Sequence, residues 1–103
     1  MISGPTLAMT TQELSLLQDI LKRYVPEFKV WAFGSRVKGT HKPYSDLDLA
    51  LVGDEPLAIE TRAALVEALS NSPLPYKVDL VDWTSATESF KEIIEKQKLV
   101  IQV

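Results

Sequence analysis

Two aspartates, Asp46 and Asp48, lie in a segment, residues 46–52, that is otherwise entirely apolar. Side chains alternate between the two faces of a β-strand, so both carboxylates would lie on one face and the intervening leucines on the other. Two carboxylates held side by side repel each other unless a cation neutralises them, and hard cations such as Mg²⁺ prefer carboxylate oxygens. The segment therefore predicts a largely buried strand that carries a divalent-metal site.

A third aspartate, Asp79, lies within the apolar segment Val78-Asp79-Leu80-Val81. A carboxylate in a buried strand is costly unless a cation or a strong set of hydrogen bonds stabilises it. Three aspartates from two neighbouring strands would hold two Mg²⁺ ions about 3.5–4 Å apart, the geometry used for in-line phosphoryl or nucleotidyl transfer. Taken by itself, an Asp-x-Asp pair at the start of a strand is more often a solvated turn. Asp79 is the residue that this simpler interpretation does not explain.

Strand alternation also separates Asp79 from Asp82, because the two residues lie three positions apart and face opposite sides of a regular strand. Asp82 stands at the end of the apolar segment, just before Trp83-Thr84-Ser85. An aspartate in that position can accept hydrogen bonds from backbone N–H groups as the next helix begins. We therefore expect Asp79 to be catalytic and Asp82 to be structural.

Gly34-Ser35 follows the strand-forming residues 29–33 and has the chemistry of a phosphate cradle. With no side chain on Gly34, backbone N–H groups and the Ser35 hydroxyl can approach phosphate oxygens closely. If Ser35 opens a short helix, the N–H groups of that helix add to the attraction for an anion. Arg36, Lys38 and Lys42 supply positive charge that we expect to be mobile. Without the aspartates downstream, the same pair would be equally compatible with a simple turn and helix N-cap.

Length and composition predict one domain. The chain has 103 residues, of which 46% are hydrophobic and 24% charged, and this supports a single hydrophobic core over residues 10–103 after a flexible tail over residues 1–9. The net charge of −3 argues against general nucleic-acid binding, which needs an excess of Lys and Arg on one face. No cysteine, no leader and no membrane-spanning segment is visible, so we expect a soluble cytoplasmic protein.

The predicted elements alternate between helices and strands. The first helix begins at a capping box formed by Thr10 and Glu13 and ends before Pro26. Ser85 and Glu88 repeat the capping-box spacing before the last helix. The order of elements predicts an α/β (α+β) fold, a small mixed β-sheet flanked by helices. We place strands at residues 29–33, 46–52, 76–81 and 99–103, and a middle helix at residues 56–71.

Three segments together carry a family resemblance: residues 34–39 (GSRVKG), 45–49 (SDLDL) and 78–82 (VDLVD). In this order and spacing the chain resembles the minimal nucleotidyltransferase (MNT) family of the DNA polymerase β superfamily. The resemblance runs from about Trp31 to the last helix. It implies the nucleotidyltransferase fold, a small mixed sheet with helices against it, which agrees with the order of elements predicted above.

The resemblance also implies roles for individual residues. Gly34 and Ser35 would hold the triphosphate of an incoming nucleotide, while Asp46 and Asp48 would bind Mg²⁺. Asp79 would be the third carboxylate, which binds metal and lowers the pKa of the attacking hydroxyl or accepts its proton. The resemblance thus implies Mg²⁺ as the cofactor and ATP as a substrate.

The remaining positions that match the nucleotide-binding part of the motif are Arg36, Lys38 and Ser45. A chain of this length leaves no room for a domain that binds nucleic acid, tRNA or an antibiotic. Transfer to a small molecule is therefore disfavoured, and we expect no membrane association and no direct nucleic-acid binding.

Single-domain members of the family resemble MNT antitoxins, which are paired with a small helical HEPN toxin. The resemblance implies that the protein transfers AMP from ATP to a protein hydroxyl, in such pairs a tyrosine of the cognate HEPN toxin, and so acts as an antitoxin by AMPylation. The alternative is a non-catalytic subunit that binds nucleotide or toxin without turnover. The three intact aspartates favour the enzyme, and the oligomeric state is open between a homodimer and a hetero-oligomer.

Overall fold

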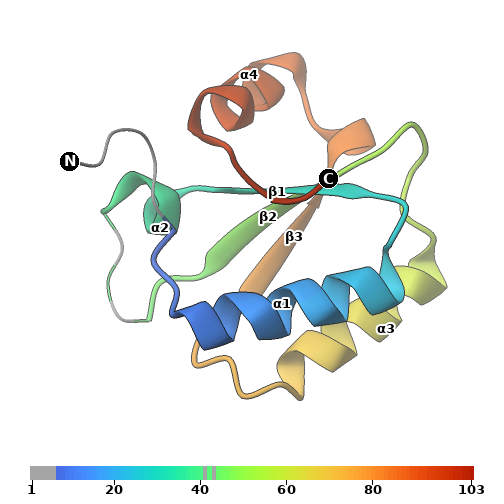
Figure 1. Cartoon of the computed structure of the whole chain (residues 1–103). Coiled ribbons are helices and arrows are strands. Elements are labelled where there is room, and N and C mark those ends of the chain that lie inside the picture. Colours follow the sequence, from blue (N-terminus) through green and yellow to red (C-terminus); the bar gives the residue numbers. More distant parts are fainter. Residues whose placement is uncertain (1–6, 41, 43) are drawn as a thin grey trace.

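A four-stranded mixed sheet forms the centre of the computed structural model, which describes residues 7–40, 42 and 44–103 (Figure 1). The strand order is β3-β2-β1-β4, with β2 and β3 parallel and the other two pairs antiparallel. The predicted fold class, a small mixed sheet flanked by helices, is confirmed. The elements are α1 (Thr11–Tyr24), β1 (Lys29–Phe33), α2 (Ser35–Lys38), β2 (Leu47–Val52), α3 (Ile59–Ser70), β3 (Val78–Asp82), the single 3₁₀ turn η1 (Trp83–Ser85), α4 (Glu88–Gln97) and β4 (Leu99–Gln102).

The two faces of the sheet have different coverings: α1 and α3 lie against one face, and α4 lies on the other (Figure 1). The larger apolar cluster fills the α1/α3 side. A smaller cluster on the α4 side contains Trp31, Phe33, Ala50 and Ile94. Trp31 and Phe33 thus pack together on one face of β1, as strand alternation requires. Main members of the larger cluster are Leu17, Leu21, Val30, Ala32, Leu47, Leu49, Leu51, Leu65 and Leu69.

The alternation along β2 and β3 decides where their acidic residues lie. Leu47, Leu49 and Leu51 point into the larger cluster, so Asp48 and Ala50 lie on the α4 face. On β3, Val78 and Leu80 contact the larger cluster while Val81 packs in the smaller one. Asp79 therefore shares the α4 face with Asp48.

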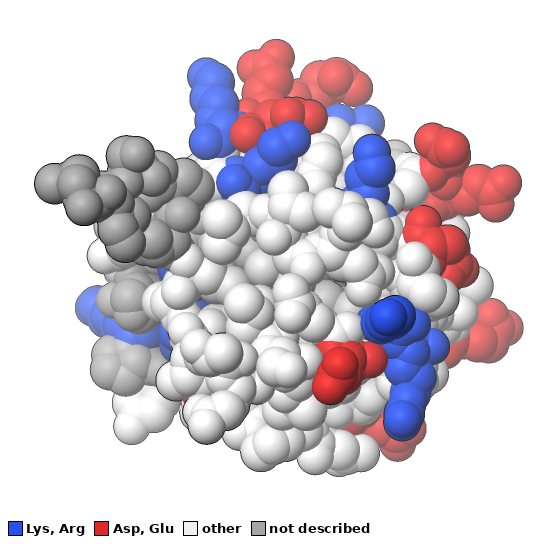
Figure 2. All heavy atoms as spheres, viewed as in Figure 1, with Lys and Arg blue, Asp and Glu red and all other residues white. Residues whose placement is uncertain are grey.

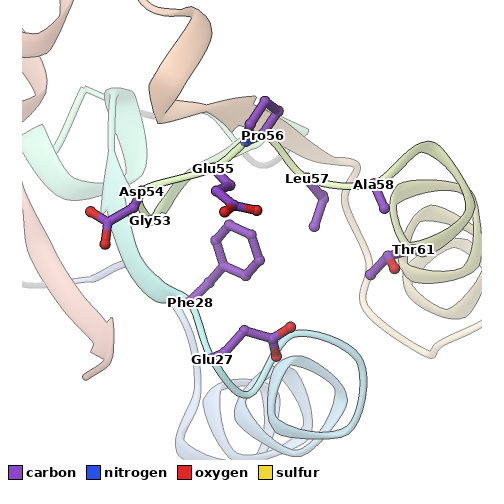
Figure 3. Close-up of a pocket in the computed structure, with 9 residues that line it drawn as sticks. All are labelled: Glu27, Phe28, Gly53, Asp54, Glu55, Pro56, Leu57, Ala58 and Thr61. Carbon is purple, nitrogen blue, oxygen red and sulfur yellow. The ribbon is translucent and has the colours of Figure 1, made fainter.

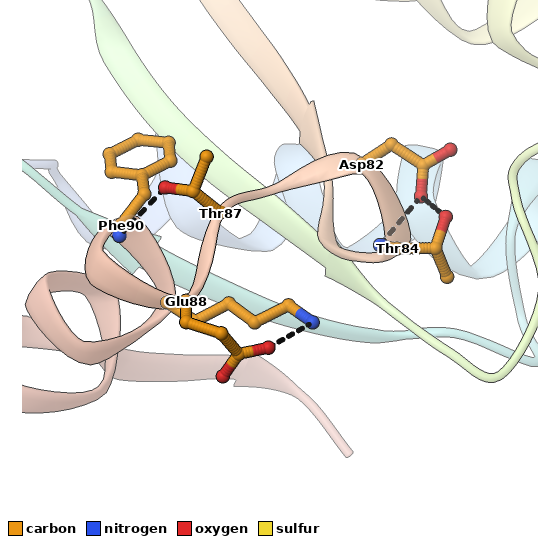
Figure 4. Close-up of polar contacts among 6 residues, drawn as sticks. Asp82, Thr84, Thr87, Glu88 and Phe90 are labelled. Atoms are coloured by element: carbon orange, nitrogen blue, oxygen red, sulfur yellow. Dashed lines mark hydrogen bonds and ion pairs between the residues drawn. The ribbon is translucent and has the colours of Figure 1, made fainter.

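The helix starts confirm one predicted cap and contradict the other. Thr10 and Glu13 form the predicted capping box, with Glu13 N–H donating to Thr10 Oγ1 at 3.0 Å and Thr10 N–H donating to Glu13 Oε1 at 3.1 Å. Ser85 does not cap α4, because it belongs to the η1 turn. Thr87 is the cap instead, and its hydroxyl accepts from Phe90 N–H at 3.2 Å (Figure 4).

The segment that precedes α1 is held against the domain where the structure describes it. Ala8 N–H donates to the carbonyl of Arg36 at 3.0 Å, and Leu7 and Met9 pack against the larger apolar cluster. Residues 7–9, which the sequence analysis assigns to a flexible tail, thus contact the domain. The remainder of the predicted tail, residues 1–6, lies outside the described residues. No helix in the described part of the chain is long and apolar enough to cross a membrane.

Candidate active site

Three aspartates meet on the α4 face of the sheet, beside the first residues of β2. Asp48 and Asp79 are register partners in the parallel β2–β3 pair. Asp46 immediately precedes β2, and its carboxyl group lies within hydrogen-bonding reach of the Asp79 carboxyl group. The structure thus brings together all three carboxylates that the sequence predicts as metal ligands and catalytic groups.

The carboxylates affect one another's protonation. The hydrogen bond with Asp79 is the main cause that raises the pKa of Asp46 above its ordinary value of 3.8; desolvation and the charge of Asp79 act in the same direction, and Lys77 opposes them. The pKa of Asp48 is also raised, mainly by desolvation and then by the charges of Asp79 and Asp46. Raised acidic pKa values in one cluster indicate negative charge that the protein itself does not neutralise.

The carboxylate oxygens of the three aspartates are donors that a hard divalent cation prefers, although the protein alone does not complete a coordination sphere. Within the described ranges, no three acidic or histidine side chains are arranged closely enough to enclose an ion by themselves. Mg²⁺ in nucleotide enzymes is commonly bound by one or two carboxylates, with the other ligands supplied by substrate phosphates and water. The aspartate cluster has the oxygen donors for such a partial site.

Gly34 lies directly against this cluster. Its backbone has φ 86° and ψ −160°, a conformation that is available to glycine and strained for other residues. A Cβ at this position would overlap with Oδ2 of Asp48. Both the conformation and the close approach therefore require glycine where β1 turns into α2.

Ser35 and Lys38 occupy the single turn that follows. Ser35 begins α2 as the sequence suggested, and its side chain is half-buried. Lys38 is exposed at the end of the turn, where its ammonium group can reach solvent or an anion. Ser45 lies in the loop before the aspartates, where its hydroxyl oxygen accepts from Lys42 N–H at 2.8 Å and leaves the hydroxyl proton for another acceptor.

Arg36 contradicts the expectation of mobile positive charge. Its side chain is only 5% exposed. The guanidinium donates to the carbonyls of Ser45 and Ala8, both at 2.9 Å, and stacks on the ring of Tyr76 at 3.8 Å. Arg36 thereby ties the loop before Asp46 to α2 and to the segment before α1. Sequence alone gave no sign of this, because the three partners are distant from each other along the chain.

The environment of β3 also differs from the prediction. β3 was expected to be a buried strand, but it is an edge strand in which only Leu80 is buried. The side chain of Asp79 is 42% exposed, and Lys77 Nζ lies 3.6 Å from its Oδ1. Asp79 is therefore accessible from solvent, as a group that handles a substrate proton must be.

Asp82 takes the structural role predicted for it. Its carboxylate accepts from Thr84 N–H at 3.3 Å and from the Thr84 hydroxyl at 2.9 Å (Figure 4), and from Leu57 N–H at 2.9 Å. These bonds cap the η1 turn and hold the segment before α3. The prediction that Asp82 bonds to backbone groups at the start of the next helical turn is confirmed.

A pocket of about 370 Å³ lies elsewhere on the described part of the chain (Figure 3). Gly53 and the residues that follow β2 line it on one side, and Phe28, just before β1, lines it on another. Because β1 and β2 are antiparallel, this cavity is at the opposite end of both strands from Gly34 and Asp48. The pocket carries acidic side chains of its own, Glu27, Asp54 and Glu55, but none of the three predicted site aspartates lines it.

The sequence did not identify one polar contact of the site. The side chain of Gln97, the last residue of α4, accepts the N–H of Gly34 through Oε1 at 2.9 Å. A contact between residues 63 positions apart leaves no local signal in the sequence.

Comparison with known proteins agrees with this geometry. Residues 16–102 match the family model described as "Polymerase beta, Nucleotidyltransferase". The Haemophilus influenzae protein named "Probable protein adenylyltransferase MntA" is 51% identical over 102 residues, which cover 99% of this chain and 90% of that protein.

Solved structures give the same result. A crystal structure described as a toxin-antitoxin with AMP-PNP matches with a TM-score of 0.72 and 28% identity, over 85% of this chain and 71% of that one. A chain from the complex of tri-AMPylated Shewanella oneidensis HEPN toxin with MNT antitoxin matches with a TM-score of 0.61 and 27% identity, over the same shares. The family match and the relative cover nearly the whole described domain, aspartate cluster included. The chain belongs to the polymerase β nucleotidyltransferase family.

Proposed function

We propose that this protein is an adenylyltransferase that moves AMP from ATP to a hydroxyl of a partner protein, a tyrosine of a HEPN-type toxin, and so acts as an antitoxin. The observation that carries the proposal is the cluster of Asp46, Asp48 and Asp79 beside Gly34. The name of the Haemophilus influenzae relative and the AMPylated toxin in the Shewanella oneidensis complex support the reaction and the acceptor.

The reaction is an in-line displacement at the α-phosphorus of ATP. The acceptor oxygen forms a new bond to the α-phosphorus, the bond from this phosphorus to the bridging oxygen of the β-phosphate breaks, and pyrophosphate leaves. The proton of the acceptor hydroxyl goes to Asp79 Oδ, which is solvent-accessible on the edge strand. The acceptor is supplied by a second protein.

Asp46 and Asp48 would hold Mg²⁺, with Asp79 as a third ligand. When bound, the ion neutralises the phosphate charge and lowers the pKa of the attacking hydroxyl. The raised pKa of Asp46 and of Asp48 supports this assignment, because a cation would replace the proton that those carboxylates favour. We assign the polar contacts with the triphosphate to Ser35, Ser45 and Lys38, while Gly34, which has no side chain, leaves room for its close approach. Arg36 would contribute by holding the loop before Asp46 rather than by contacting phosphate.

The surface offers a place for a protein partner. Figure 2 shows an uncharged expanse in the middle of the face turned to the viewer, over α1 and the sheet edge at β4. Charged side chains lie mostly around it. Val100 on β4 and Ile93 on α4 are each 48% exposed. Exposed apolar side chains beside an uncharged surface are typical of protein interfaces.

Because the reaction consumes ATP, we place the protein in the cytoplasm.

The decisive experiment measures label transfer. We expect α-³²P-labelled ATP to label the HEPN-type protein encoded by the adjacent gene, with pyrophosphate as the second product. The control is the acceptor protein with its tyrosines replaced by phenylalanine. Stable binding of the partner without any label transfer would contradict the enzyme and favour the non-catalytic alternative.

Calorimetry tests the metal separately. ATP in EDTA should bind much more weakly than ATP with Mg²⁺, because the aspartates and the triphosphate share the ion as ligands. Equal affinity under both conditions would contradict the metal site while leaving partner binding untouched.

A further inference from the structure

The hydrogen bond between Gly34 and Gln97 occurs where a strand ladder stops. In the antiparallel β1–β4 pair, Trp31 faces Val100 and Ala32 faces Leu99. Extending this register by two residues places Gly34 opposite Gln97. The backbone of Gln97 belongs to α4 and cannot continue the ladder, so its side-chain carbonyl takes the place of the missing strand and accepts the Gly34 N–H at 2.9 Å.

Both backbone polar groups of Gly34 are thereby engaged. Its carbonyl accepts from Val37 N–H and Lys38 N–H, both at 3.0 Å, and so forms the first turn of α2. Its N–H is held by Gln97. Two fixed groups on one residue determine the orientation of both peptide planes around it. Gly34 therefore keeps its positive φ because α2 holds one side and α4 holds the other.

The orientation of Gly34 matters because this residue lies against the catalytic carboxylate. Its α-carbon approaches Asp48 so closely that a Cβ would overlap with Oδ2. If the Gly34 peptide rotated, the wall against which the Asp48 side chain rests would move with it. The line of contacts runs from Gln97 through Gly34 to Asp48.

We propose that Gln97 is a positioning residue for nucleotidyl transfer, which holds Gly34 in the conformation that fixes Asp48 and the start of α2. The inference rests on the proposed function. It also assigns the Gly34 N–H to the protein, so the triphosphate receives its backbone hydrogen bonds from residues after Gly34. A residue that acts this way changes the rate of the chemical step more than it changes the affinity for nucleotide.

The test compares two substitutions at Gln97. Gln97→Met keeps the length of the side chain but removes the acceptor, whereas Gln97→Glu keeps an acceptor oxygen. We expect Gln97→Met to lower kcat for AMP transfer about 10-fold while the KM for ATP stays within about threefold, because small misplacements of reacting groups are costly in rate. Gln97→Glu should restore most of the lost rate. Lys96→Met is the matched control, because Lys96 is an exposed neighbour on the same helix.

A second measurement reports on the contact itself. Amide hydrogen exchange at Gly34, followed by NMR, should be about 10-fold faster in Gln97→Met than in the wild type and close to wild type in Gln97→Glu. The carboxyl ¹³C signal of Asp48 should shift in the methionine variant alone. These signals need neither nucleotide nor partner, so they decide the positioning role even if the wild-type chain transfers no AMP, which would refute the proposed function separately.

Two results would overturn the inference. The first is unchanged Gly34 exchange in Gln97→Met, which would mean that the contact does not hold the glycine. The second is faster exchange at Gly34 with an unshifted Asp48 signal or an unchanged kcat, which would mean that the glycine is held but does not position the carboxylate.

Discussion

Strand β3 carries two aspartates, Asp79 and Asp82, whose carboxylates have opposite electrostatic surroundings. Asp79 is the second residue of the strand and lies beside Asp46 and Asp48, where three carboxylates share one face. Asp82 lies at the end of the strand on the other face, where two N–H groups and one hydroxyl donate to its carboxylate. The first aspartate adds to a local excess of negative charge, and the second has its charge dispersed over neutral donors.

The comparison indicates that the hydrogen-bond donors around each carboxylate distinguish the proposed functional aspartate, Asp79, from the structural Asp82. Hydrogen-bond donors around Asp82 stabilise the fold at no cost to its neighbours. The carboxylates around Asp79 destabilise one another, and proteins tolerate such arrangements mainly at functional sites. Substitutions at the two positions should therefore have opposite consequences for activity and stability.

The largest expected effect is on catalysis at Asp79. Asp79→Asn removes the proton acceptor and one metal ligand with little change in shape, so AMP transfer to the partner should fall by ~10²-fold or more. Single-turnover assays with labelled ATP measure the rate, with Asp82→Asn as the matched control. An active Asp79→Asn beside an inactive Asp82→Asn would reverse the comparison and with it the assignment of the third site residue.

Gly34→Ala tests whether the aspartate cluster needs a residue without a side chain beside Asp48. The new Cβ would overlap with Asp48 Oδ2, so we expect the transfer rate to fall about 10-fold or more as the carboxylate is displaced. Gly39→Ala is the control, because Gly39 also has a positive φ of 82° but no atom lies within 4 Å of a Cβ built there. Equal losses in both variants would attribute the effect to backbone strain alone.

Asp82→Asn should affect stability more than rate. Asparagine keeps one acceptor oxygen but presents an NH₂ group to one of the donors, Leu57 or Thr84, so unfolding should become easier by about 1 kcal/mol. Urea denaturation measures this, and the rate of AMP transfer should stay within about threefold of the wild type. A loss of activity without a loss of stability would place Asp82 in the active site.

The smallest effect is a gain of stability at Asp48. The pKa of Asp48 is raised in the folded protein, so its charge is unfavourable to folding above that raised pKa and has no effect well below 3.8, where the group is protonated in both states. Asp48→Asn should therefore raise the melting temperature at pH 7 by roughly 1–3 °C, because exposure screens much of the repulsion. Calorimetric scans at pH 7 and pH 3 test the sign. A gain that persists unchanged at pH 3 would have another origin.

Sequence patterns predicted the parts of the fold that depend on local chemistry. The alternation along residues 46–52 placed Asp46 and Asp48 on one face, and the spacing of Thr10 and Glu13 predicted the first helix start. The second capping pattern failed because Thr87 competes with Ser85, and the bonds of Asp82 to Thr84 favour a separate turn before the helix. Two overlapping local patterns cannot be ranked without the packing around them.

The parts that sequence did not predict depend on pairings between distant residues. The order of strands makes β3 an edge strand, and no local pattern in residues 76–81 distinguishes an edge from a centre. Arg36 is buried because Tyr76 and Ala8 reach it from far along the chain. The aspartate cluster was predictable because each strand carries its own carboxylate, whereas its supports at Arg36 and Gln97 exist only in the folded chain.

The central position of β1 has a consequence for how the domain assembles. β1 pairs with β2, which follows soon after it in sequence, and with β4, which is separated from it by most of the chain. Contacts between distant segments form late and slowly, because a long loop must close before they contribute. One edge of the apolar strand Lys29–Phe33 therefore stays unpaired for much of folding, and in that interval the chain is most exposed to aggregation and to proteases.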